Sequence, residues 1–161
     1  ALSGLKRDIT PSGLAHIHLA EAASPADPGA ISREYFNLFV GVGRGELVPY
    51  ASFYLTGFLA EKPLVRLRGD LQTLGVERAP ERREPEDHIA ILCEIMAGMC
   101  SGALETPAGA DRTIFEHHLK PWAARFFADL ETAQNAGFYR HVGAIGRMLM
   151  EIETEALDWA A

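Results

Sequence analysis

The C-terminal quarter of the chain carries the most regular hydrophobic pattern in the sequence. Apolar residues recur there at alternating intervals of four and three, at Phe138, Val142, Ile145, Leu149, Ile152, Ala156 and Trp159. These intervals match the 3.6-residue turn of an α-helix, so the spacing predicts one long helix with a sustained inward seam. Such a helix requires other helices or a sheet to cover its apolar side.

The rest of the pattern is also helical, because β-branched alternation and Asn-Gly hairpin turns are absent. The other predicted helices cover residues 11–23, 31–40, 51–60, 63–74, 84–100 and 111–134, the last with Asp111 as its cap. Two of them have a predicted apolar stripe: Leu64, Leu67, Leu71 and Leu74 in 63–74, and Ile114, Phe115, Leu119, Trp122, Phe126 and Leu130 in 111–134. We therefore expect an all-α fold, a single-domain helical bundle of about six helices over residues 1–161. The charged connector 76–84 is a predicted hinge, and the first 30 residues have the least regular pattern.

Composition narrows the class of protein further. The 161 residues are 48% hydrophobic and 23% charged, which is typical of one soluble globular domain. No apolar run approaches the roughly 20 residues of a membrane span, and no export signal is visible at the start. The net charge of −7 disfavours nucleic acids and anionic membranes as partners. Cys93 and Cys100 lie too far apart along one helix for a disulfide, and we expect both to be buried and reduced, as in a cytoplasmic protein.

The segment EPEDH, Glu84 to His88, places acids directly before an apolar run. Pro85 suits the first turn of a helix, and Glu86 and Asp87 would favour the positive end of its dipole. A cation is disfavoured there, so His88 is expected to be a neutral imidazole that hydrogen-bonds to a backbone group or an acid. Two interpretations of the acids remain open at this point: a structural hydrogen-bond network and a partly buried acidic groove for a partner.

Metal binding and catalysis have weaker support. Histidines stand at 88, 117 and 118, but adjacent histidines on a helix diverge by about 100° and no HxxxH or CxxC pair is present, so we expect no metal site. His118, with apolar neighbours, is expected to be a satisfied histidine at the edge of the core. No nucleophile elbow or triad is present, so no catalytic residue and no enzymatic activity are predicted.

The glycine-rich stretch GVGRG, Gly41 to Gly45, raises an alternative function. A small nucleotide-binding (GTP) switch or enzyme would use this loop together with Asp87 and His88. A dinucleotide fingerprint requires a preceding strand, and a phosphate loop requires Lys-Ser/Thr, so a tight turn between helices is the better interpretation and no cofactor is predicted. The aromatic residues that follow, from Tyr50 to Phe58, fit either core packing or a peptide groove.

Three segments together carry a resemblance: YFNLFVGVGRGELVPYASFYLTG (35–57), EPEDHIAILCEIM (84–96) and HHLKPWAARFFADLE (117–131). In this order they resemble the TorD/DmsD/NarJ family of redox-enzyme maturation chaperones, over roughly residues 31–159. One departure is Val42, where proline is common in the family. A second is the part before Ile31, which resembles the family poorly, so the resemblance implies that a helix of the bundle is lacking and that the N-terminal part is truncated.

The resemblance implies an all-helical cytoplasmic chaperone. It would bind the N-terminal leader of a molybdenum-containing oxidoreductase, a twin-arginine signal where the client is exported, and hold the apoenzyme until its cofactor is inserted. The peptide-binding residues carried over are Tyr50, Ser52, Tyr54, Glu84, Pro85, Asp87 and His88. The chain would act as a monomer or as a homodimer that exchanges helices through the 76–84 connector.

A leader with two arginines requires carboxylates for the guanidinium groups and an aromatic or aliphatic lining for its apolar stretch. Asp87, with Glu84 or Glu86, could supply the carboxylates. On this interpretation Asp87→Asn weakens leader binding but leaves the melting temperature almost unchanged.

Overall fold

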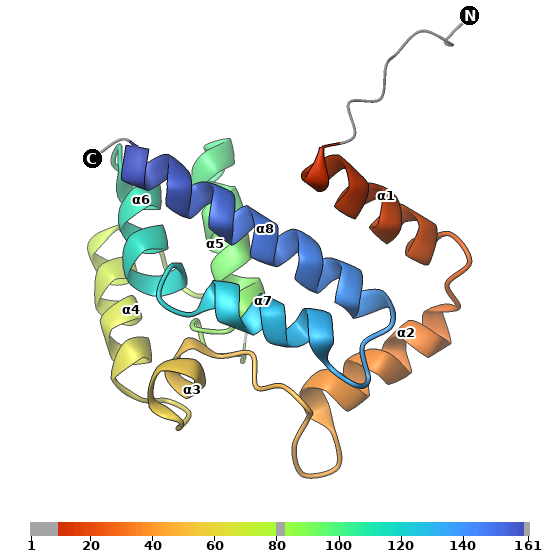
Figure 1. The fold of residues 1–161 in the computed structure, drawn as a ribbon. Coiled ribbons are helices and arrows are strands. Elements are labelled where there is room, and N and C mark those ends of the chain that lie inside the picture. The colour runs from red at the N-terminus through yellow and green to blue at the C-terminus, as the bar shows by residue number, and fades with distance from the viewer. Residues whose placement is uncertain (1–9, 80–82, 160–161) are drawn as a thin grey trace, which may run out of the picture. The chain divides into compact units, whose positions relative to one another are not determined.

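The computed structural model describes residues 10–79 and 83–159, and these residues form helices joined by loops (Figure 1). In chain order the elements are α1 (Pro11–Ala23), α2 (Pro28–Tyr35), η1 (Phe36–Val40), α3 (Ala51–Thr56), α4 (Lys62–Thr73), α5 (Ile89–Ser101), α6 (Ala110–Ile114), η2 (Phe115–Leu119), α7 (Ala123–Thr132) and α8 (Phe138–Trp159). The elements η1 and η2 are π-helical. Within the described residues no strand forms, and the all-α prediction is confirmed.

The chain divides into two compact units. Unit 1 comprises the described residues up to Leu47 together with Phe127–Leu149. Unit 2 comprises the described residues of Val48–Phe126 together with those from Met150 onward. The prediction of a single domain therefore stays a prediction.

Unit 1 is organised by two carboxylates that accept hydrogen bonds from backbone N–H groups. Glu34, on α2, accepts from Gly137, Phe138 and Tyr139 at 2.7–3.0 Å, where α8 begins. Glu46 accepts from the backbone of Gln134 and Asn135 at 2.6 and 3.0 Å. Helix N-termini leave N–H groups without intrahelical partners, so Glu34 satisfies the donors that α8 cannot.

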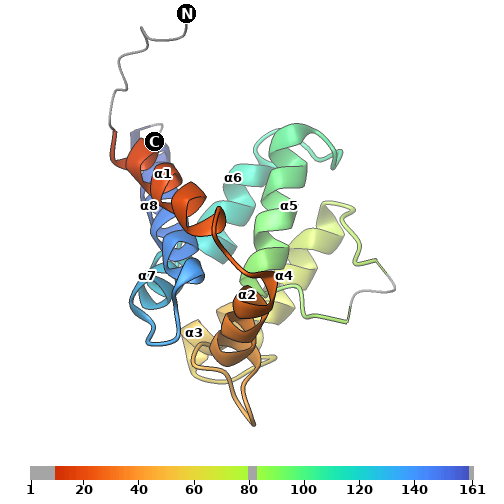
Figure 2. The ribbon, with the colours of Figure 1, turned by 90° about the vertical axis from the view of Figure 1, so that its right-hand side faces the viewer.

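Unit 2 has a leucine-rich face on α4, and η2 ends at a proline-containing turn. Leu64, Leu67 and Leu71 of α4 are buried, as the sequence predicts, and α4 packs against α3. The helix α5 packs against α6 and η2 (Figure 2). Pro121 lies in the turn between η2 and α7 and divides the predicted 111–134 helix, and that helix's predicted stripe is buried at Ile114, Phe115, Leu119, Trp122, Phe126 and Leu130.

The predicted seam of the last helix is wrong in its second half. Leu149, Ile152 and Trp159 are 47, 49 and 92% exposed. The buried positions of α8 are instead Gly143, Gly146 and Met150. A Cβ added to Gly143 would lie 2.7 Å from the backbone nitrogen of Glu131, so α7 and α8 approach each other too closely there for a larger side chain.

Three smaller expectations also need correction or a limit. Gly109, in the left-handed region at φ 83°, precedes α6 as its cap in place of Asp111. Cys93 is partly buried and Cys100 is exposed, although both are free as expected. Residues 80–82 of the predicted hinge lie outside the described part of the chain, and its other residues have no helix. Among the described helices none is long and apolar enough to cross a membrane.

Candidate functional site

The segment before α3 and the segment before α5 are joined by a short backbone ladder in unit 2. Tyr50 and His88 form an isolated antiparallel bridge. The Ala51 N–H donates to the Asp87 carbonyl at 2.9 Å, and the Ile89 N–H donates to the Pro49 carbonyl at 2.9 Å. The two segments singled out in the sequence therefore lie side by side, although nearly 40 residues separate them.

Asp87 is the buried centre of this junction, with only 1% of its surface exposed. Its Oδ2 accepts a hydrogen bond from the Ser52 backbone N–H at 2.9 Å and another from the Ser52 hydroxyl at 2.6 Å. Ser52 is fully buried as well. A buried carboxylate is tolerated only with such partners, so this pair ties the start of α3 to the segment before α5.

His88, and no acid, caps α5. The helix begins at Ile89, four residues after Pro85, and the Nδ1 of His88 accepts from the Ala90 N–H at 3.1 Å. Two predictions are therefore wrong: Pro85 does not occupy the first turn of the helix, and Asp87 does not lie in that turn at the positive end of the helix dipole. Both residues precede the helix, in a turn that is closed by a hydrogen bond from the His88 N–H to the Pro85 carbonyl.

The protonation state of His88 follows from this geometry. An Nδ1 that accepts a backbone N–H carries no proton of its own. Burial lowers the pKa of His88 below its ordinary 6.5, and the charges of Glu84 and Asp87 only partly oppose this effect. The expectation of a neutral, hydrogen-bonded imidazole is confirmed.

The exposed edge of the junction consists of an aromatic pair and a carboxylate. The ring of Tyr50 meets the ring of His88 edge-on, with centroids 5.0 Å apart. The Tyr50 hydroxyl donates to Oε1 of Glu84, and Glu84 is exposed. Next to it, Nη2 of Arg68 lies 2.8 Å from Oε2 of Glu86. Burial alone would raise the pKa of Glu86, but the hydrogen bond and the charge of Arg68 outweigh burial, so the pKa of Glu86 is lowered overall.

Tyr54 belongs to a different neighbourhood. The centroid of its ring lies 5.4 Å from the ring centroid of Trp122 and 5.8 Å from that of Phe126. The guanidinium carbon of Arg125 lies 5.8 Å from the centroid of the Tyr54 ring. Ser52 and Tyr54 are two residues apart on α3, so their side chains point about 200° apart around the helix. The structure thus brings together Tyr50, Ser52, Glu84, Pro85, Asp87 and His88, while Tyr54 packs among aromatic residues on another side of α3.

The GVGRG loop lies in unit 1, and its glycines have a steric explanation. Gly41 adopts φ 61°, and a Cβ there would lie 2.1 Å from the Arg44 carbonyl oxygen. A Cβ on Gly45 would lie 2.5 Å from the backbone of Phe39. The loop is a tight turn after η1, as the sequence favours, and its glycines are required by backbone packing.

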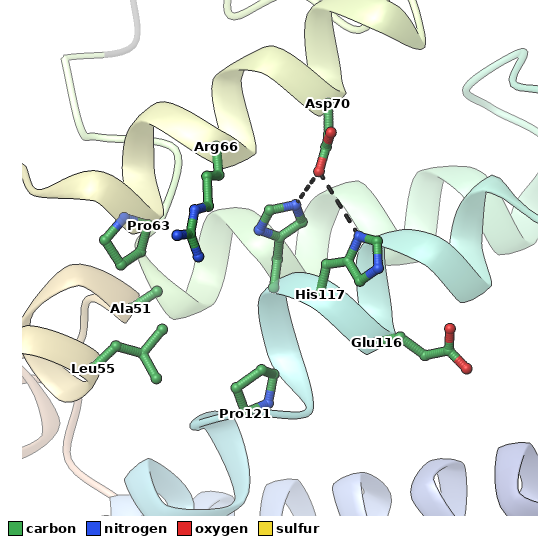
Figure 3. A pocket seen from close by; sticks show the side chains of 9 residues that line it. Ala51, Leu55, Pro63, Arg66, Asp70, Glu116, His117 and Pro121 are labelled. Atoms are coloured by element: carbon green, nitrogen blue, oxygen red, sulfur yellow. Dashed lines mark hydrogen bonds and ion pairs between the residues drawn. The ribbon is translucent and has the colours of Figure 1, made fainter.

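A second polar cluster, absent from the predicted site, faces a hollow of about 560 Å³ in unit 2 (Figure 3). His117 and His118 of η2 both approach Asp70 of α4. His118 is buried and contacts Asp70, which confirms its expected place at the edge of the core. Sequence reasoning missed Asp70, because nothing in its local pattern links it to residues 47 positions later.

Comparison with known proteins identifies the family. Residues 8–128 match the model of a family described as "Nitrate reductase delta subunit". The chain belongs to the nitrate reductase delta subunit family. The match includes both segments of the junction, and the resemblance drawn from the sequence is confirmed.

Curated relatives of this nitrate reductase delta subunit family member are named as chaperones. "Chaperone protein TorD" of Aliivibrio fischeri is 26% identical over 137 residues, which cover 79% of this chain and 64% of the relative. TorD of Vibrio cholerae is also 26% identical, over 80% of this chain and 62% of the relative. "Probable Tat proofreading chaperone DmsD" of Haemophilus influenzae is 30% identical over 112 residues, which cover 68% of this chain and 53% of the relative. The chain thus spans a little under two thirds of the length of these TorD relatives.

Proposed function

We propose that this chain is a cytoplasmic, non-catalytic chaperone for a molybdenum-containing oxidoreductase. It binds the N-terminal leader of the apoenzyme, a twin-arginine signal where the client is exported, and holds the precursor until its cofactor is inserted. Membership of the nitrate reductase delta subunit family supports this function, as do the relatives named as a TorD chaperone and as a probable Tat proofreading chaperone.

The observation that carries the proposal is the junction between the segments before α3 and α5. Its backbone ladder and the buried Ser52–Asp87 pair fix Tyr50, Glu84 and His88 relative to one another. A fixed arrangement lowers the entropy cost of binding a flexible peptide. The junction therefore suits recognition better than a mobile loop would.

Within this site the buried and exposed residues have different tasks. Asp87 is enclosed, with Oδ2 accepting from Ser52, so its task is to hold the junction together. Glu84 is the exposed carboxylate, and we assign it the contact with a leader arginine, since carboxylates bind guanidinium groups through paired hydrogen bonds. Tyr50 orients Glu84 through its hydroxyl, and Pro85 shapes the turn that presents it.

The apolar part of a leader needs a separate surface. Large exposed hydrophobic side chains lie close together in the sequence from the end of α3 to the first turn of α4, at Leu55, Phe58, Leu59 and Val65. Clusters of this kind mark interaction sites more often than isolated exposed residues do. We assign this cluster to the apolar stretch of the leader, and Tyr54 supports it from the core through Trp122 and Phe126.

Fluorescence anisotropy with a labelled leader peptide tests the proposal. The probe is a synthetic twin-arginine leader of a molybdopterin oxidoreductase, and its control has the same composition in scrambled order. We expect Glu84→Gln to weaken binding about five- to tenfold, because it removes an exposed charge-assisted contact of roughly 1 kcal/mol. Glu105→Gln, which removes an exposed charge elsewhere in unit 2, is the matched control and should bind as wild type does.

Two results would contradict this assignment. Equal binding of the leader and the scrambled peptide would refute leader recognition itself. Equal weakening by Glu84→Gln and Glu105→Gln would show that net charge alone attracts the peptide. Asp87 is unsuited to this test, because substituting it disturbs the Ser52 hydrogen bonds and confuses binding with stability.

A further inference from the structure

The histidine pair of η2 and Asp70 of α4 form a compact set of metal-ligating side chains. The Nε2 of His118 lies 2.7 Å from Oδ2 of Asp70, and the Nδ1 of His117 lies 4.0 Å from the same oxygen (Figure 3). One ligand atom from each residue lies within 4.8 Å of both others. Two imidazole nitrogens and a carboxylate oxygen thus lie close together at the wall of the hollow.

The π-helical geometry of η2 explains how adjacent histidines reach one carboxylate. On an α-helix, consecutive side chains diverge by about 100°, which made the pair an unpromising ligand set. In η2 the Lys120 N–H donates to the Phe115 carbonyl at 2.8 Å, an i→i+5 bond that places more residues in each turn. Consecutive side chains diverge less in such a turn, and π-helical turns are frequent at functional sites.

We propose that Asp70, His117 and His118 bind one divalent transition-metal ion of the zinc class. Two ligands of a tetrahedral zinc, each about 2.0–2.1 Å from the ion, lie roughly 3.4 Å apart. The observed separations of 2.7 and 4.0 Å fall on either side of this value. Asp70 and His117 are partly or largely exposed, so small rotations of both side chains toward the ion reach it while buried His118 stays in place.

The surroundings leave room for a further ligand. Three protein ligands with an open position are typical of zinc sites that bind water or another small donor. The hollow in front of the cluster is also lined by Arg66 and Glu116. The fourth position is therefore assigned to water or to an anionic donor beside Arg66.

A purely structural role does not account for all three residues. Asp70 alone satisfies the buried His118 through their hydrogen bond. The side chain of His117 is 61% exposed and its ring meets that of His118 edge-on, with centroids 6.1 Å apart, so burial does not require it to be turned toward Asp70. His117 is thus the residue that separates a metal site from a simple buried hydrogen bond.

Cobalt titration of the full chain, prepared without a polyhistidine tag and stripped with chelator, tests the site. We expect one equivalent of Co²⁺ to give the visible absorption of tetrahedral coordination, and Zn²⁺ to displace it. His117→Ala should weaken Zn²⁺ affinity by at least about tenfold, because even outer-shell changes cost that much. His16→Ala, an exposed histidine of α1, is the matched control and should bind as wild type does.

Thermal unfolding with and without Zn²⁺ supplies a second readout. Because an ion that binds the folded state stabilises it, Zn²⁺ at one fixed concentration should raise the Tm of wild type and of His16→Ala more than that of His117→Ala. Without metal, His117→Ala should melt close to wild type, since the His118–Asp70 bond is intact. Equal Zn²⁺ affinity in wild type and His117→Ala, or no stoichiometric Co²⁺ binding by wild type, would overturn the proposal.

Discussion

The side chains of Asp87 and His88 are neighbours in the sequence, yet they have opposite environments and tasks. Asp87 is enclosed and accepts from Ser52, whereas His88 caps α5 and contacts Tyr50 at the edge of the junction. The acids and the histidine before an apolar run drew attention to this segment, and the family resemblance implied that both residues bind the peptide. It could not show that Asp87 points inward, since Ser52, its partner, lies 35 positions earlier and carries no pairing signal. The expectation that Asp87→Asn spares stability therefore has to be replaced by a destabilisation.

His88 should make the stability of the protein depend on pH. Its pKa is lowered in the folded state by burial, so the unfolded chain takes up a proton first as the pH falls below about 6.5. This contribution to stability is complete above that pH and is lost as the pH falls toward the folded-state pKa. We therefore expect the free energy of unfolding in urea to fall less between pH 7.5 and pH 5.5 in His88→Asn than in wild type, because asparagine also caps helices but does not titrate.

The informative quantity is the difference between wild type and His88→Asn in the stability lost between these two pH values. His141→Asn, at a partly buried histidine of unit 1 that caps no helix, is the control for replacing a histidine by asparagine away from α5. An identical slope in His88→Asn and wild type would mean that His88 accepts a proton as readily when folded as when unfolded.

Helix identity was predictable in this chain, whereas helix ends and faces were less so. Leu64, Leu67 and Leu71 follow helical spacing and are buried as expected. The start of α5 was misplaced because Pro85 and two acids fit a first helical turn equally well, and only the bridge from Tyr50 to His88 decides the point. On α8 the apolar spacing was real, but Gly143 and Gly146 determine which side faces α7. Hydrophobic periodicity cannot detect a contact made by glycines.

Two glycines inside helices should respond oppositely to alanine. Gly69 of α4 is exposed, and an added Cβ would have no atom within 4 Å, so Gly69→Ala should stabilise the protein by roughly 0.5–1 kcal/mol through helix propensity. A Cβ on Gly143 would meet the backbone of α7 at 2.7 Å, so Gly143→Ala should destabilise by about 1–3 kcal/mol through overpacking.

Urea unfolding of the two variants measures both effects. Since each glycine-to-alanine change gains the same intrinsic helix propensity, the difference between the two changes in unfolding free energy isolates the effect of the close approach of α7 and α8. A stabilising Gly143→Ala would show that these helices separate easily, against the tight contact described for unit 1.

At the scale of the whole molecule, the two units draw on shared helices. The division between them falls at Phe126–Phe127 within α7 and at Leu149–Met150 within α8. Helix formation is cooperative, so melting half of a helix removes support from the turns that remain. Sequence analysis placed one domain over the whole chain, and shared helices are a physical reason to expect the units to unfold together.

Unfolding followed by two probes tests this expectation, because the chain's two tryptophans, Trp122 and Trp159, both lie in unit 2. Tryptophan fluorescence therefore reports on unit 2 alone, whereas far-UV circular dichroism reports on the helices of both units. For a single cooperative domain, the two urea transitions should share one midpoint and one slope. A circular dichroism transition with a second step that fluorescence lacks would mean that unit 1 unfolds separately.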